Sequence, residues 1–326
     1  MTGRIVAVLI AAVATLLVVT TIAPQTSGIL ALAQILLPHA VLAAILAGGV
    51  AGAAVRTRAP LVALAVVVLV ACIRFGSEWA SLPAPSPSGP AVTLTSWNLE
   101  LGARSASTVA GPLLEHDAEI VALQELTPDA STALDLDSRI VARYPYRLLL
   151  PDVGAFGIGI LTTFPILDKE VADAPPGVIV TLDLGSSRHL RVLNAHPLPG
   201  KIGLIGGLRV PVSFDATERD AAIGRVRNRI DSLFASHDPF VVIGDYNSAP
   251  TEPAYARLSA GLHDVHVDVG EGPGWTWRPS SLEPLRIGLL RIDLVLTGPG
   301  VQPISTGVDC GRVGDHCILD ASVSVR

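Results

Sequence analysis

Charged residues are scarce in this chain of 326 residues: Asp, Glu, Lys and Arg make up only 16% of it, hydrophobic residues make up 50%, and the mean hydropathy is +0.52. An average soluble domain carries about 25% charged residues. The shortage therefore excludes an ordinary soluble protein of this length. It is concentrated at the amino-terminal end, where residues 5–23, 28–55 and 59–73 contain no charge.

The three uncharged stretches predict membrane-spanning helices. A helix needs about 20 apolar residues to cross the hydrocarbon core of a bilayer, and the first two stretches are long enough. The third is long enough if residues 75–79 extend it and the Arg74 side chain reaches the interface. A cleaved signal peptide is the alternative for the first stretch, because Arg4 precedes it. Two further spans follow without a convincing cleavage site, which favours a permanent anchor.

Basic residues predict which way the anchor is inserted. Arg4 precedes the first stretch, and Arg56 and Arg58 lie between the second and the third, whereas residues 24–27 carry no basic side chain. Short segments with basic residues stay on the cytoplasmic side. We therefore expect a multi-pass protein of the cell membrane, with a cytoplasmic amino terminus and an extracytoplasmic carboxy-terminal domain.

A proline-rich segment divides the chain. Residues 81–90 alternate proline with small residues, which predicts an extended, semi-rigid spacer. The predicted domains are a membrane anchor at 1–80, the linker at 81–90 and an outer domain at 91–326. Four arginines and one glutamate precede the linker, so the outer domain keeps 19 of the 23 basic and 28 of the 29 acidic residues, a net charge of −9. Such an acidic domain disfavours nucleic acid as a partner.

Cysteine is also rare, with three residues in the chain. Cys72 falls in the third uncharged stretch and is expected to pack as a small apolar residue. Cys310 and Cys317 would close a small disulfide loop in an oxidising compartment. The alternative is two free thiols in a cytoplasmic domain, and the spacing of the two residues does not decide between these readings.

The outer domain contains one run of residues that predicts a site. Residues 240–243 are apolar without alternation, which predicts a strand buried on both faces. Asp245 and Asn247 follow at its end, and side chains two apart on an extended chain point the same way, whereas Tyr246 points elsewhere. An acid and an amide beside a glycine suit reactions in which a proton moves and an oxyanion is held.

Other predicted strands also end on polar residues. Asn98 ends the strand predicted at residues 92–98, Glu125 ends the one at 120–125, and His196 follows the one at 188–194. Polar groups at the ends of several buried strands predict a site at one rim of a sheet. Further strands are expected at residues 146–150, 157–162 and 178–184.

Two more features complete this description of the outer domain. Asp315 beside His316, with Asp293 upstream, allows a carboxylate to orient an imidazole. Helices are predicted at residues 107–116 and 217–236. In the second helix we expect an inward apolar face that includes Ala221, and a solvated face formed by Arg219, Arg225, Arg227 and Arg229.

Taken in order, these residues form a recognisable series. The motifs are Ser-Trp-Asn-Leu at Asn98, Leu-Gln-Glu at Glu125, Asn-Ala-His at His196, Gly-Asp-Tyr-Asn-Ser at Asp245 and Asn247, Arg-Ile-Asp at Asp293, and Gly-Asp-His at Asp315 and His316. The series resembles the endonuclease/exonuclease/phosphatase superfamily, the metal-dependent group that includes DNase I-like nucleases, inositol phosphatases and neutral sphingomyelinases. The resemblance covers residues 92–326.

This resemblance implies an α/β fold, a four-layer α/β sandwich of two packed mixed sheets with helices outside. It also implies phosphoester hydrolysis assisted by Mg²⁺, with Mn²⁺ as a candidate substitute. Glu125 would hold the metal with help from Asn98 and Asp315. Magnesium prefers oxygen ligands and keeps several waters, so this small set is sufficient. Neither the histidine spacing nor the cysteines form a usual zinc ligand set.

The resemblance also assigns catalytic roles. Asp245 and Asn247 would position the attacking water and the phosphoryl group. His316, oriented by Asp293, would act on the phosphate oxygens or on the proton of the water, and His196 would steady the transition state or the leaving group. The chain departs from the family pattern at Gly314, where serine is frequent, and at Thr162-Thr163, where Ser-Arg is usual.

The substrate is suggested by a long apolar segment and by the anchor. Residues 197–212 form an apolar, glycine-rich loop that begins beside His196, and we expect it to dip into the outer leaflet; the alternative is a loop that covers its own core. Three spans followed by an outer domain of this kind resemble actinobacterial teicoplanin-resistance membrane proteins. The resemblance implies a lipid-linked phosphate or diphosphate as substrate, such as undecaprenyl diphosphate. The alternatives are a membrane-anchored nuclease and a catalytically silent interaction module, and the sequence identifies no protein partner.

Overall fold

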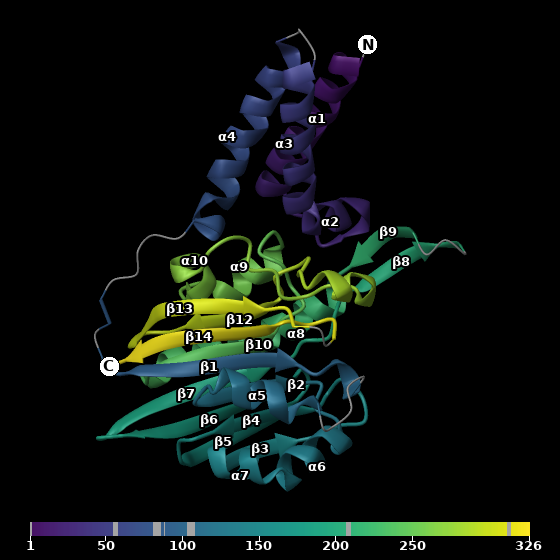
Figure 1. The fold of residues 1–326 in the computed structure, drawn as a ribbon. Helices are drawn as coiled ribbons and strands as arrows, with labels where there is room; N and C mark the ends of the chain where they lie inside the picture. The colour runs from purple at the N-terminus through teal and green to yellow at the C-terminus, as the bar shows by residue number, and fades with distance from the viewer. Residues whose placement is uncertain are drawn as a thin grey trace. The chain divides into compact units, whose positions relative to one another are not determined.

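The computed structural model describes residues 2–54, 58–80, 86–87, 89–102, 108–206, 210–311 and 314–326. The chain forms two compact units (Figure 1). The helical unit comprises Met1–Ser77, Gly200–Glu218 and Ala249–Tyr255, and the sheet unit comprises Glu78–Pro199, Arg219–Ser248 and Ala256–Arg326. Some predicted features lie outside the described residues. They are the basic residue Arg56, most of the linker at 81–90, the first residue of the helix predicted at 107–116 and the middle of the apolar loop. The linear boundary at residues 81–90 stays a prediction.

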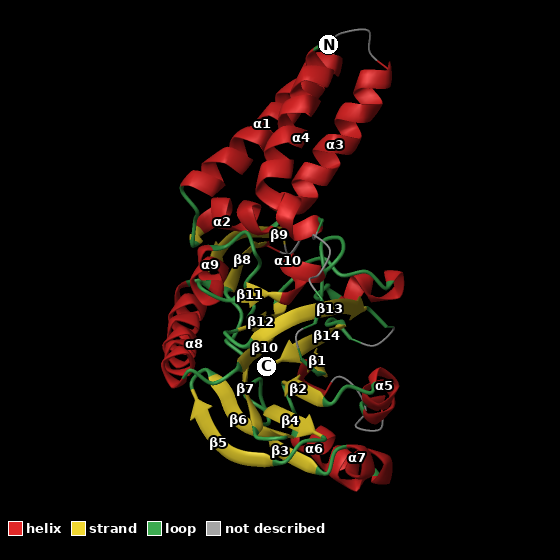
Figure 2. Ribbon diagram, turned by 90° about the vertical axis from the view of Figure 1, so that its left-hand side faces the viewer, coloured by secondary structure: helices red, strands yellow, loops and turns green. Residues whose placement is uncertain are grey.

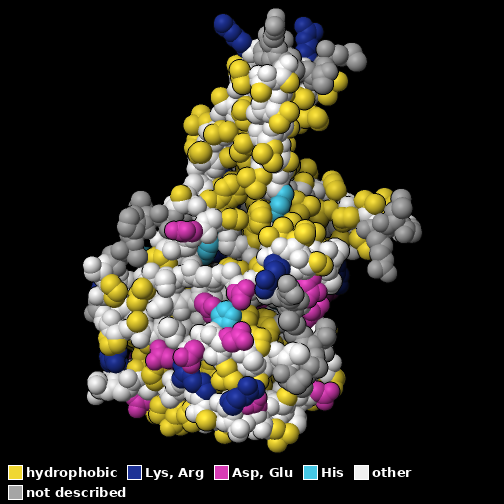
Figure 3. Space-filling view, viewed as in Figure 1, with side chains coloured by type: hydrophobic (Ala, Val, Ile, Leu, Met, Phe, Trp, Pro, Cys, Tyr) yellow, Lys and Arg dark blue, Asp and Glu magenta, His cyan; other side chains and the backbone are white. Residues whose placement is uncertain are grey.

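Three apolar helices dominate the helical unit. They are α1 (Thr2–Ile22), α3 (Leu37–Ala54) and α4 (Ala59–Trp79), and each contains a segment long and apolar enough to cross a membrane. Apolar side chains cover their outer surfaces, whereas acidic side chains gather over the sheet unit (Figure 3). The amino end of α1, the carboxyl end of α3 and the amino end of α4 lie at the same end of the bundle (Figures 1 and 2).

Small residues let these helices pack closely. Ile10, Ala14, Ala44 and Val67 form a buried cluster that joins all three helices. A Cβ atom at Gly48 would lie only 3.0 Å from the Cδ1 atom of Ile10, so the glycine allows α1 and α3 to approach each other. In lipid, where apolar contact alone gives no preference for another helix, close approach of this kind stabilises helix association.

The second uncharged stretch forms two consecutive helices. The short helix α2 (Gly28–Ile35) ends at Leu36, and α3 begins at Leu37. Pro38 explains the break, because proline lacks an N–H group and is accepted in the first turn of a helix but not in its interior. The helix α3 alone is the second candidate span.

The apolar segment after His196 is a hairpin and not an irregular loop. Strand β8 (Lys201–Ile205) pairs with the antiparallel strand β9 (Val210–Asp215). The hairpin continues onto the chain ahead of α2 through bridges that join Ser27 to Asp215 and Gly28 to Phe214. The sequence suggested a loop because neither strand alternates polar and apolar residues.

The sheet unit contains two six-stranded mixed sheets. One has the order β13-β14-β1-β2-β4-β3, and the other has the order β11-β12-β10-β7-β6-β5. Their strands are β1 (Ala91–Asn98), β2 (Ile120–Gln124), β3 (Tyr146–Leu150), β4 (Ile158–Thr162), β5 (Ile166–Asp173), β6 (Pro176–Gly185), β7 (Arg188–Ala195), β10 (Phe240–Asp245), β11 (His263–Asp264), β12 (Asp293–Thr297), β13 (Val301–Asp309) and β14 (Ile318–Val325).

The main core lies between the two sheets. Apolar side chains from both sheets form it, including Leu94, Ile160, Val180, Val241 and Val323. A second cluster lies beneath the helices on the outer face of the first sheet. Helix α8 (Thr217–Ser236) covers the second sheet, where the Phe234 and Phe240 rings meet edge to face at 5.1 Å. Figure 2 shows the resulting layers, which confirm the predicted four-layer sandwich.

The remaining helices are mostly short. They are α5 (Ala110–His116), α6 (Pro128–Leu136) and α7 (Ser138–Arg143) on the first sheet, α8 (Thr217–Ser236), α9 (Pro253–Ser259), α10 (Val265–Val269) and the 3₁₀ segments η1 (Glu100–Gly102) and η4 (Ser280–Leu285).

The bounds of α8 agree with the prediction, but some residues expected on its buried face are exposed, and the reverse. Ala221 is exposed and Ala222 is buried in its place, and Arg219 is buried.

Strand directions explain where the polar side chains meet. Strand β1 runs parallel to β2, and β10 runs parallel to β7, so the carboxyl ends of each pair lie at one rim. The neighbours β12 and β14 run antiparallel to them and begin at that rim. Asp293, the first residue of β12, is therefore directly opposite Asp245, the last residue of β10.

Candidate active site

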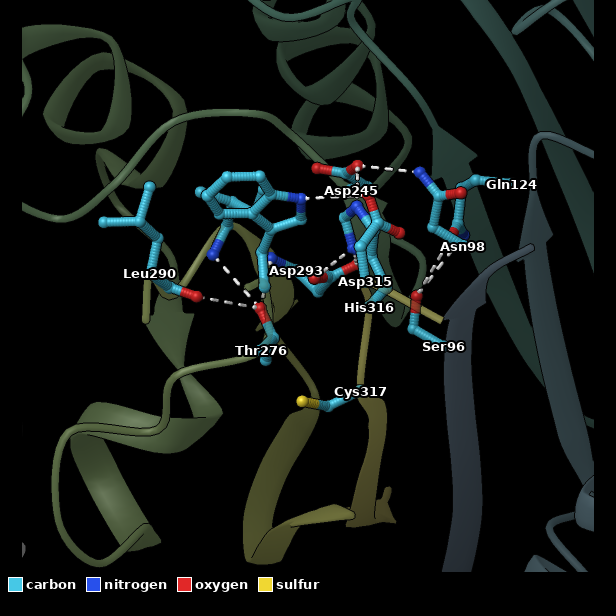
Figure 4. A network of polar contacts seen from close by, with 12 residues as sticks. Ser96, Asn98, Gln124, Asp245, Thr276, Leu290, Asp293, Asp315, His316 and Cys317 are labelled. Atoms are coloured by element: carbon cyan, nitrogen blue, oxygen red, sulfur yellow. Dashed lines mark hydrogen bonds and ion pairs between the residues drawn. The ribbon is translucent and has the colours of Figure 1, made fainter. Parts of the chain in front are cut away.

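All eight predicted site residues lie in the sheet unit, and hydrogen bonds or ion pairs connect seven of them directly. Figure 4 shows five of the eight, Asn98, Asp245, Asp293, Asp315 and His316, with the hydrogen bond from Asn98 to Asp245. Asn98, at the end of β1, links two carboxylates: its Nδ2 atom donates to Glu125 Oε1 and to Asp245 Oδ2, each at 3.0 Å. Glu125 and Asn247 both have left-handed backbone conformations, with φ of 53° and 50°. Such conformations are costly for residues with a side chain and tend to occur at functional sites.

His196 is completely buried beside these carboxylates. Its Nδ1 atom lies 3.0 Å from the carbonyl oxygen of Ala155, so it donates there and presents Nε2 to the site. The Nε2 atom lies 3.5 Å from Asp245 Oδ2 and 3.7 Å from Glu125 Oε1. Burial opposes protonation of the ring, but the hydrogen bond and the charges of Asp245 and Glu125 outweigh it and raise the pKa of His196.

Asn247 and Arg219 complete this side of the site. The Nδ2 atom of Asn247 lies 3.3 Å from His196 Nε2 and donates to the carbonyl oxygen of Pro197 at 3.1 Å. Arg219, expected on a solvated face, is instead buried and donates to the carbonyl oxygen of Asn247 at 2.8 Å. Its Nε and Nη2 atoms bind the Asp220 carboxylate, which balances its charge and explains how the guanidinium is accommodated.

His316 lies between two aspartates at the other side. Its Nδ1 atom lies 3.0 Å from Asp293 Oδ2, and its Nε2 atom lies 3.6 Å from Asp245 Oδ2. Burial opposes its protonation, but the charges of Asp293 and Asp245 dominate and raise the pKa of His316 to about 10. Burial would raise the pKa of Asp245, but His316 and His196 outweigh that effect and lower it. The arrangement keeps a carboxylate and an imidazolium together among buried side chains.

Asp315 offers an unused acceptor. Its Oδ2 atom accepts a hydrogen bond from Nε1 of Trp277 at 3.3 Å, whereas Oδ1 is buried and has no hydrogen-bond partner among the described residues. A buried carboxylate oxygen without a donor is costly unless a cation approaches it. An unpartnered carboxylate oxygen is the kind of ligand that a hard divalent cation prefers.

Two sets of side chains are candidates for holding that cation. Among the described residues, the ligand atoms of Asp245, Asp293 and His316 lie within 4.8 Å of one another. In this set, however, His316 and Asp293 are already hydrogen-bonded to each other. The predicted set of Asn98, Glu125 and Asp315 contains the orphaned oxygen, and it stays a prediction.

Several supporting residues were missed by reading the sequence. Thr276 is buried, and its Oγ1 atom accepts hydrogen bonds from the backbone N–H groups of Ile292 and Asp293 at 3.2 and 3.1 Å. It thereby fixes the start of β12. Arg278 is buried nearby and donates to the carbonyl oxygens of Cys310, Gly311 and Gly314. In the sequence, only the Thr-Trp-Arg run at residues 276–278 could have pointed to Thr276 and Arg278 as supporting residues.

The loop that Arg278 holds is closed by a disulfide. Cys310 and Cys317 are bonded, so the structure decides the question that their spacing left open. Cys317 follows His316 directly, and its backbone N–H donates to the carbonyl oxygen of Thr276 at 2.7 Å. The disulfide, Arg278 and Thr276 together restrain the segment that carries Asp315 and His316.

A buried amide pair joins the two sheets below the site. Gln124 on β2 donates to Asn194 Oδ1 on β7 at 2.8 Å. The Nδ2 atom of Asn194 in turn donates to the carbonyl oxygens of Leu123 and Gly159 at 3.0 and 2.9 Å. Because buried amides with full sets of partners restrict how two layers can slide, this pair fixes the relative position of the two strand ends.

Gly244 allows β10 to approach β7 closely. Its φ is +142°, and a Cβ atom there would overlap the carbonyl oxygen of Ala195. No other residue fits at this position without moving a strand. The close approach brings Asp245 beside His196.

Comparisons with known proteins agree with this geometry. The family model for the Endonuclease/Exonuclease/phosphatase family matches residues 95–316, more than half of the chain. A comparison with curated protein sequences found no match.

Solved structures share the fold. A conserved protein of unknown function from Enterococcus faecalis V583 has a TM-score of 0.56 at 15% identity, covering 72% of this chain and 100% of that one. A humanized D. rerio TDP2 has a TM-score of 0.56 at 19% identity, covering 72% and 99%. The 3′ phosphatase NExo from Neisseria, bound to a product DNA hairpin, has a TM-score of 0.55 at 19% identity, covering 71% and 98%.

Proposed function

Because the chain belongs to the endonuclease/exonuclease/phosphatase family, we propose that it is a membrane-anchored, Mg²⁺-dependent hydrolase of a lipid-linked phosphoester or diphosphate, such as undecaprenyl diphosphate. Mn²⁺ is the expected substitute for Mg²⁺. The observation that carries the proposal is that one chain combines three apolar helices with a buried rim of carboxylates and histidines.

Each site residue has a proposed role. Asn98, Glu125 and Asp315 hold the cation, which neutralises charge on the phosphoryl oxygens when it is bound. Asp245 accepts a proton from the attacking water, and Asn247 orients the phosphoryl group through its Nδ2 atom. The contacts of Asp245 and Asn247 with Asn98 and His196 support the roles proposed for these two residues.

The two histidines act as cationic donors in this proposal. His316, held by Asp293 and protonated because of its raised pKa, donates to a phosphate oxygen. His196 presents Nε2 to the site and stabilises the charge that develops on the leaving group. Donors fixed before the reaction begins stabilise a transition state without further reorganisation.

The basic residues of the helical unit support the proposed orientation in the membrane. Arg4 lies at the start of α1 and Arg58 precedes α4, at the same end of the bundle. Basic residues at one end favour a cytoplasmic position for that end. An extracytoplasmic sheet unit is consistent with the Cys310–Cys317 disulfide, because disulfides persist in oxidising compartments. A carboxy-terminal reporter that is active only in the cytoplasm would contradict this orientation.

The activity can be tested on the detergent-solubilised chain. We expect Mg²⁺-dependent phosphate release from undecaprenyl diphosphate, and its loss in Glu125→Ala and in His316→Ala. Val153→Ala, at a highly exposed position of the sheet unit, is the matched control and should retain the rate. If both site variants release phosphate as fast as the unsubstituted chain, the assignment of the site is wrong.

A nuclease is the second candidate, because the structures with the same fold include a 3′ phosphatase bound to DNA. The net charge of −9 on residues 91–326 argues against it, since binding of a phosphate backbone depends on basic side chains. Cleavage of plasmid DNA at a rate comparable to that of lipid hydrolysis would favour the nuclease. A chain that binds no divalent cation and hydrolyses neither substrate would instead be a silent interaction module.

A further inference from the structure

The hairpin β8–β9 exposes apolar side chains that its own packing does not require. Ile202, Leu204, Ile205 and Val210 are exposed by 54, 51, 63 and 48%. A two-stranded hairpin is only marginally stable in water, and one with apolar side chains on both faces is less stable still. These side chains therefore require an apolar environment outside the described chain.

The same hairpin is fixed to the end of the first candidate span. The backbone N–H of Ala216 donates to the carbonyl oxygen of Thr26 at 3.0 Å, and bridges join Ser27 to Asp215 and Gly28 to Phe214. Only four residues separate Ile22, where the span ends, from Ser27. The hairpin thus continues directly from the helix that enters the membrane.

The helix α2 adds apolar surface to the hairpin. It contains no charged residue, and its Ile29 and Leu30 side chains are exposed, whereas Ala31 and Leu32 are buried. Its start is fixed by the Gln34 side chain, whose Oε1 atom accepts from the backbone N–H of Gln25 at 2.9 Å. The exposed Ile29 and Leu30 side chains therefore extend the apolar surface close to the end of the first candidate span.

Charged groups in the described part of the hairpin are confined to its base. Lys201 pairs with Glu218 at 2.6 Å, and Asp215 accepts hydrogen bonds from Thr217. Between Lys201 and Asp215 the described strand residues are all uncharged.

We propose that hairpin β8–β9 and helix α2 form one membrane-contacting surface, here called the interfacial platform, which is occupied by the headgroup and upper acyl region of the bilayer that holds α1 and α3. The proposal rests on the membrane anchor and not on the hydrolytic chemistry. Along the chain, only four residues separate His196 from Lys201, so the platform also tethers the segment that leaves the candidate active site.

The proposal is tested by fluorescence of the full chain in vesicles of phosphatidylethanolamine and phosphatidylglycerol. Cys72→Ala removes the free thiol, and Leu204→Cys or Ile205→Cys then carries an environment-sensitive NBD label. Val153→Cys, 91% exposed in the sheet unit, is the aqueous control, and Leu46→Cys, 71% exposed on α3, is the membrane control. We expect labels at 204 and 205 to be quenched by lipids with a shallow nitroxide and to be several-fold less quenched by iodide than the label at 153.

Two outcomes would overturn the platform. Iodide quenching at 204 and 205 equal to that at 153 would place the hairpin in water. Protection from both iodide and nitroxide lipids would mean that the hairpin covers the protein itself. Because the readout requires no turnover, neither result can be confused with failure of the proposed activity.

A kinetic comparison extends the test. Replacement of Ile202, Leu204 and Ile205 by serine should slow hydrolysis of a vesicle-borne lipid diphosphate several-fold and leave hydrolysis of a soluble phosphoester unchanged. The matched control replaces Leu136 and Val153, which are exposed apolar residues of the sheet unit, by serine. Equal losses on the lipid and the soluble substrate would contradict a role in membrane contact.

Discussion

Two regions of the sheet unit contain a histidine between two aspartates. At the rim, His316 lies 3.0 Å from Asp293 and 3.6 Å from Asp245. On the surface formed by α5, β13 and β14, His116 lies 2.5 Å from Asp320 and 3.5 Å from Asp309. The residue types and the distances are similar, yet only the first region has the other properties of an active site.

The difference lies in burial and in the neighbours. His316 and both of its aspartates are buried, and Asn98 links one of them to Glu125. The aspartates beside His116 are partly exposed, so water screens their charges. An Asp-His-Asp arrangement therefore becomes a candidate catalytic group only where several strand ends bring further polar atoms into the same buried space.

The largest expected effect comes from removing one charge at the rim. Asp293→Asn should reduce kcat by about 10²–10³-fold, the range for loss of one preorganised donor, because it removes the carboxylate that keeps His316 protonated. NMR titration should show the pKa of His316 falling from about 10 towards its ordinary value. Asp320→Asn is the matched change beside His116 and should leave kcat unchanged. Equal effects of the two changes would remove the distinction between the regions.

The next effect concerns the cation. Glu125→Gln should weaken Mg²⁺ binding by at least about tenfold, because the neutral amide is a poorer ligand than a carboxylate. Isothermal titration calorimetry on the detergent-solubilised chain measures this change directly. Asp309→Asn, in the second region, should leave the affinity unchanged; weaker binding there would point to a metal site at His116.

A third test asks how far the rim depends on its support. Cys310→Ser with Cys317→Ser should lower the free energy of unfolding by about 2 kcal/mol, since it removes a small closed loop. It should also lower kcat, because the loop restrains Asp315 and His316. Denaturant unfolding and phosphate release measure the two effects. Unchanged kcat would show that Arg278 and Thr276 are sufficient to hold the segment.

The smallest effect is the pH dependence of the second region. The hydrogen bond to Asp320 outweighs burial and raises the pKa of His116 above 6.5. The protonated His116 therefore contributes stability that is fully present below about pH 6.5 and is lost as pH rises through the raised pKa. His116→Gln should cost at most about 1 kcal/mol at low pH, the usual limit for partly exposed ion pairs. Denaturant unfolding at several pH values measures the difference in unfolding free energy between the unsubstituted protein and His116→Gln. This difference should disappear at high pH. A difference that does not change with pH would mean that the His116 ring stabilises the fold only by packing.

The sequence was sufficient to predict the rim, because buried strands are recognisable as apolar runs and the polar residues that follow them are few. Asp245, Asn98 and Glu125 were found in this way, and the structure brings them together. The roles assigned to them remain predictions. The bounds of α8 were also predicted correctly, since its apolar residues repeat at helical spacing.

Other features depend on tertiary contacts that no local pattern reveals. The hairpin β8–β9 was expected to be a loop, because its residues do not alternate between polar and apolar. Its pairing with the chain ahead of α2 is a tertiary contact that such a pattern does not reveal. Arg219 was expected in solvent, but Asp220 and the Asn247 carbonyl oxygen hold it inside. Thr276 acts through backbone N–H groups sixteen and seventeen residues away, which its own position in the sequence does not suggest.

The contact at Gly244 limits how this rim can be remodelled. The Ala195 carbonyl oxygen occupies the space that any side chain at position 244 would need. An engineer who wishes to widen the gap between Asp245 and His196 for a bulkier substrate cannot do so by changing either residue alone, because the spacing of the paired strands β7 and β10 sets their separation. Broadened specificity would have to come from the loops above the rim.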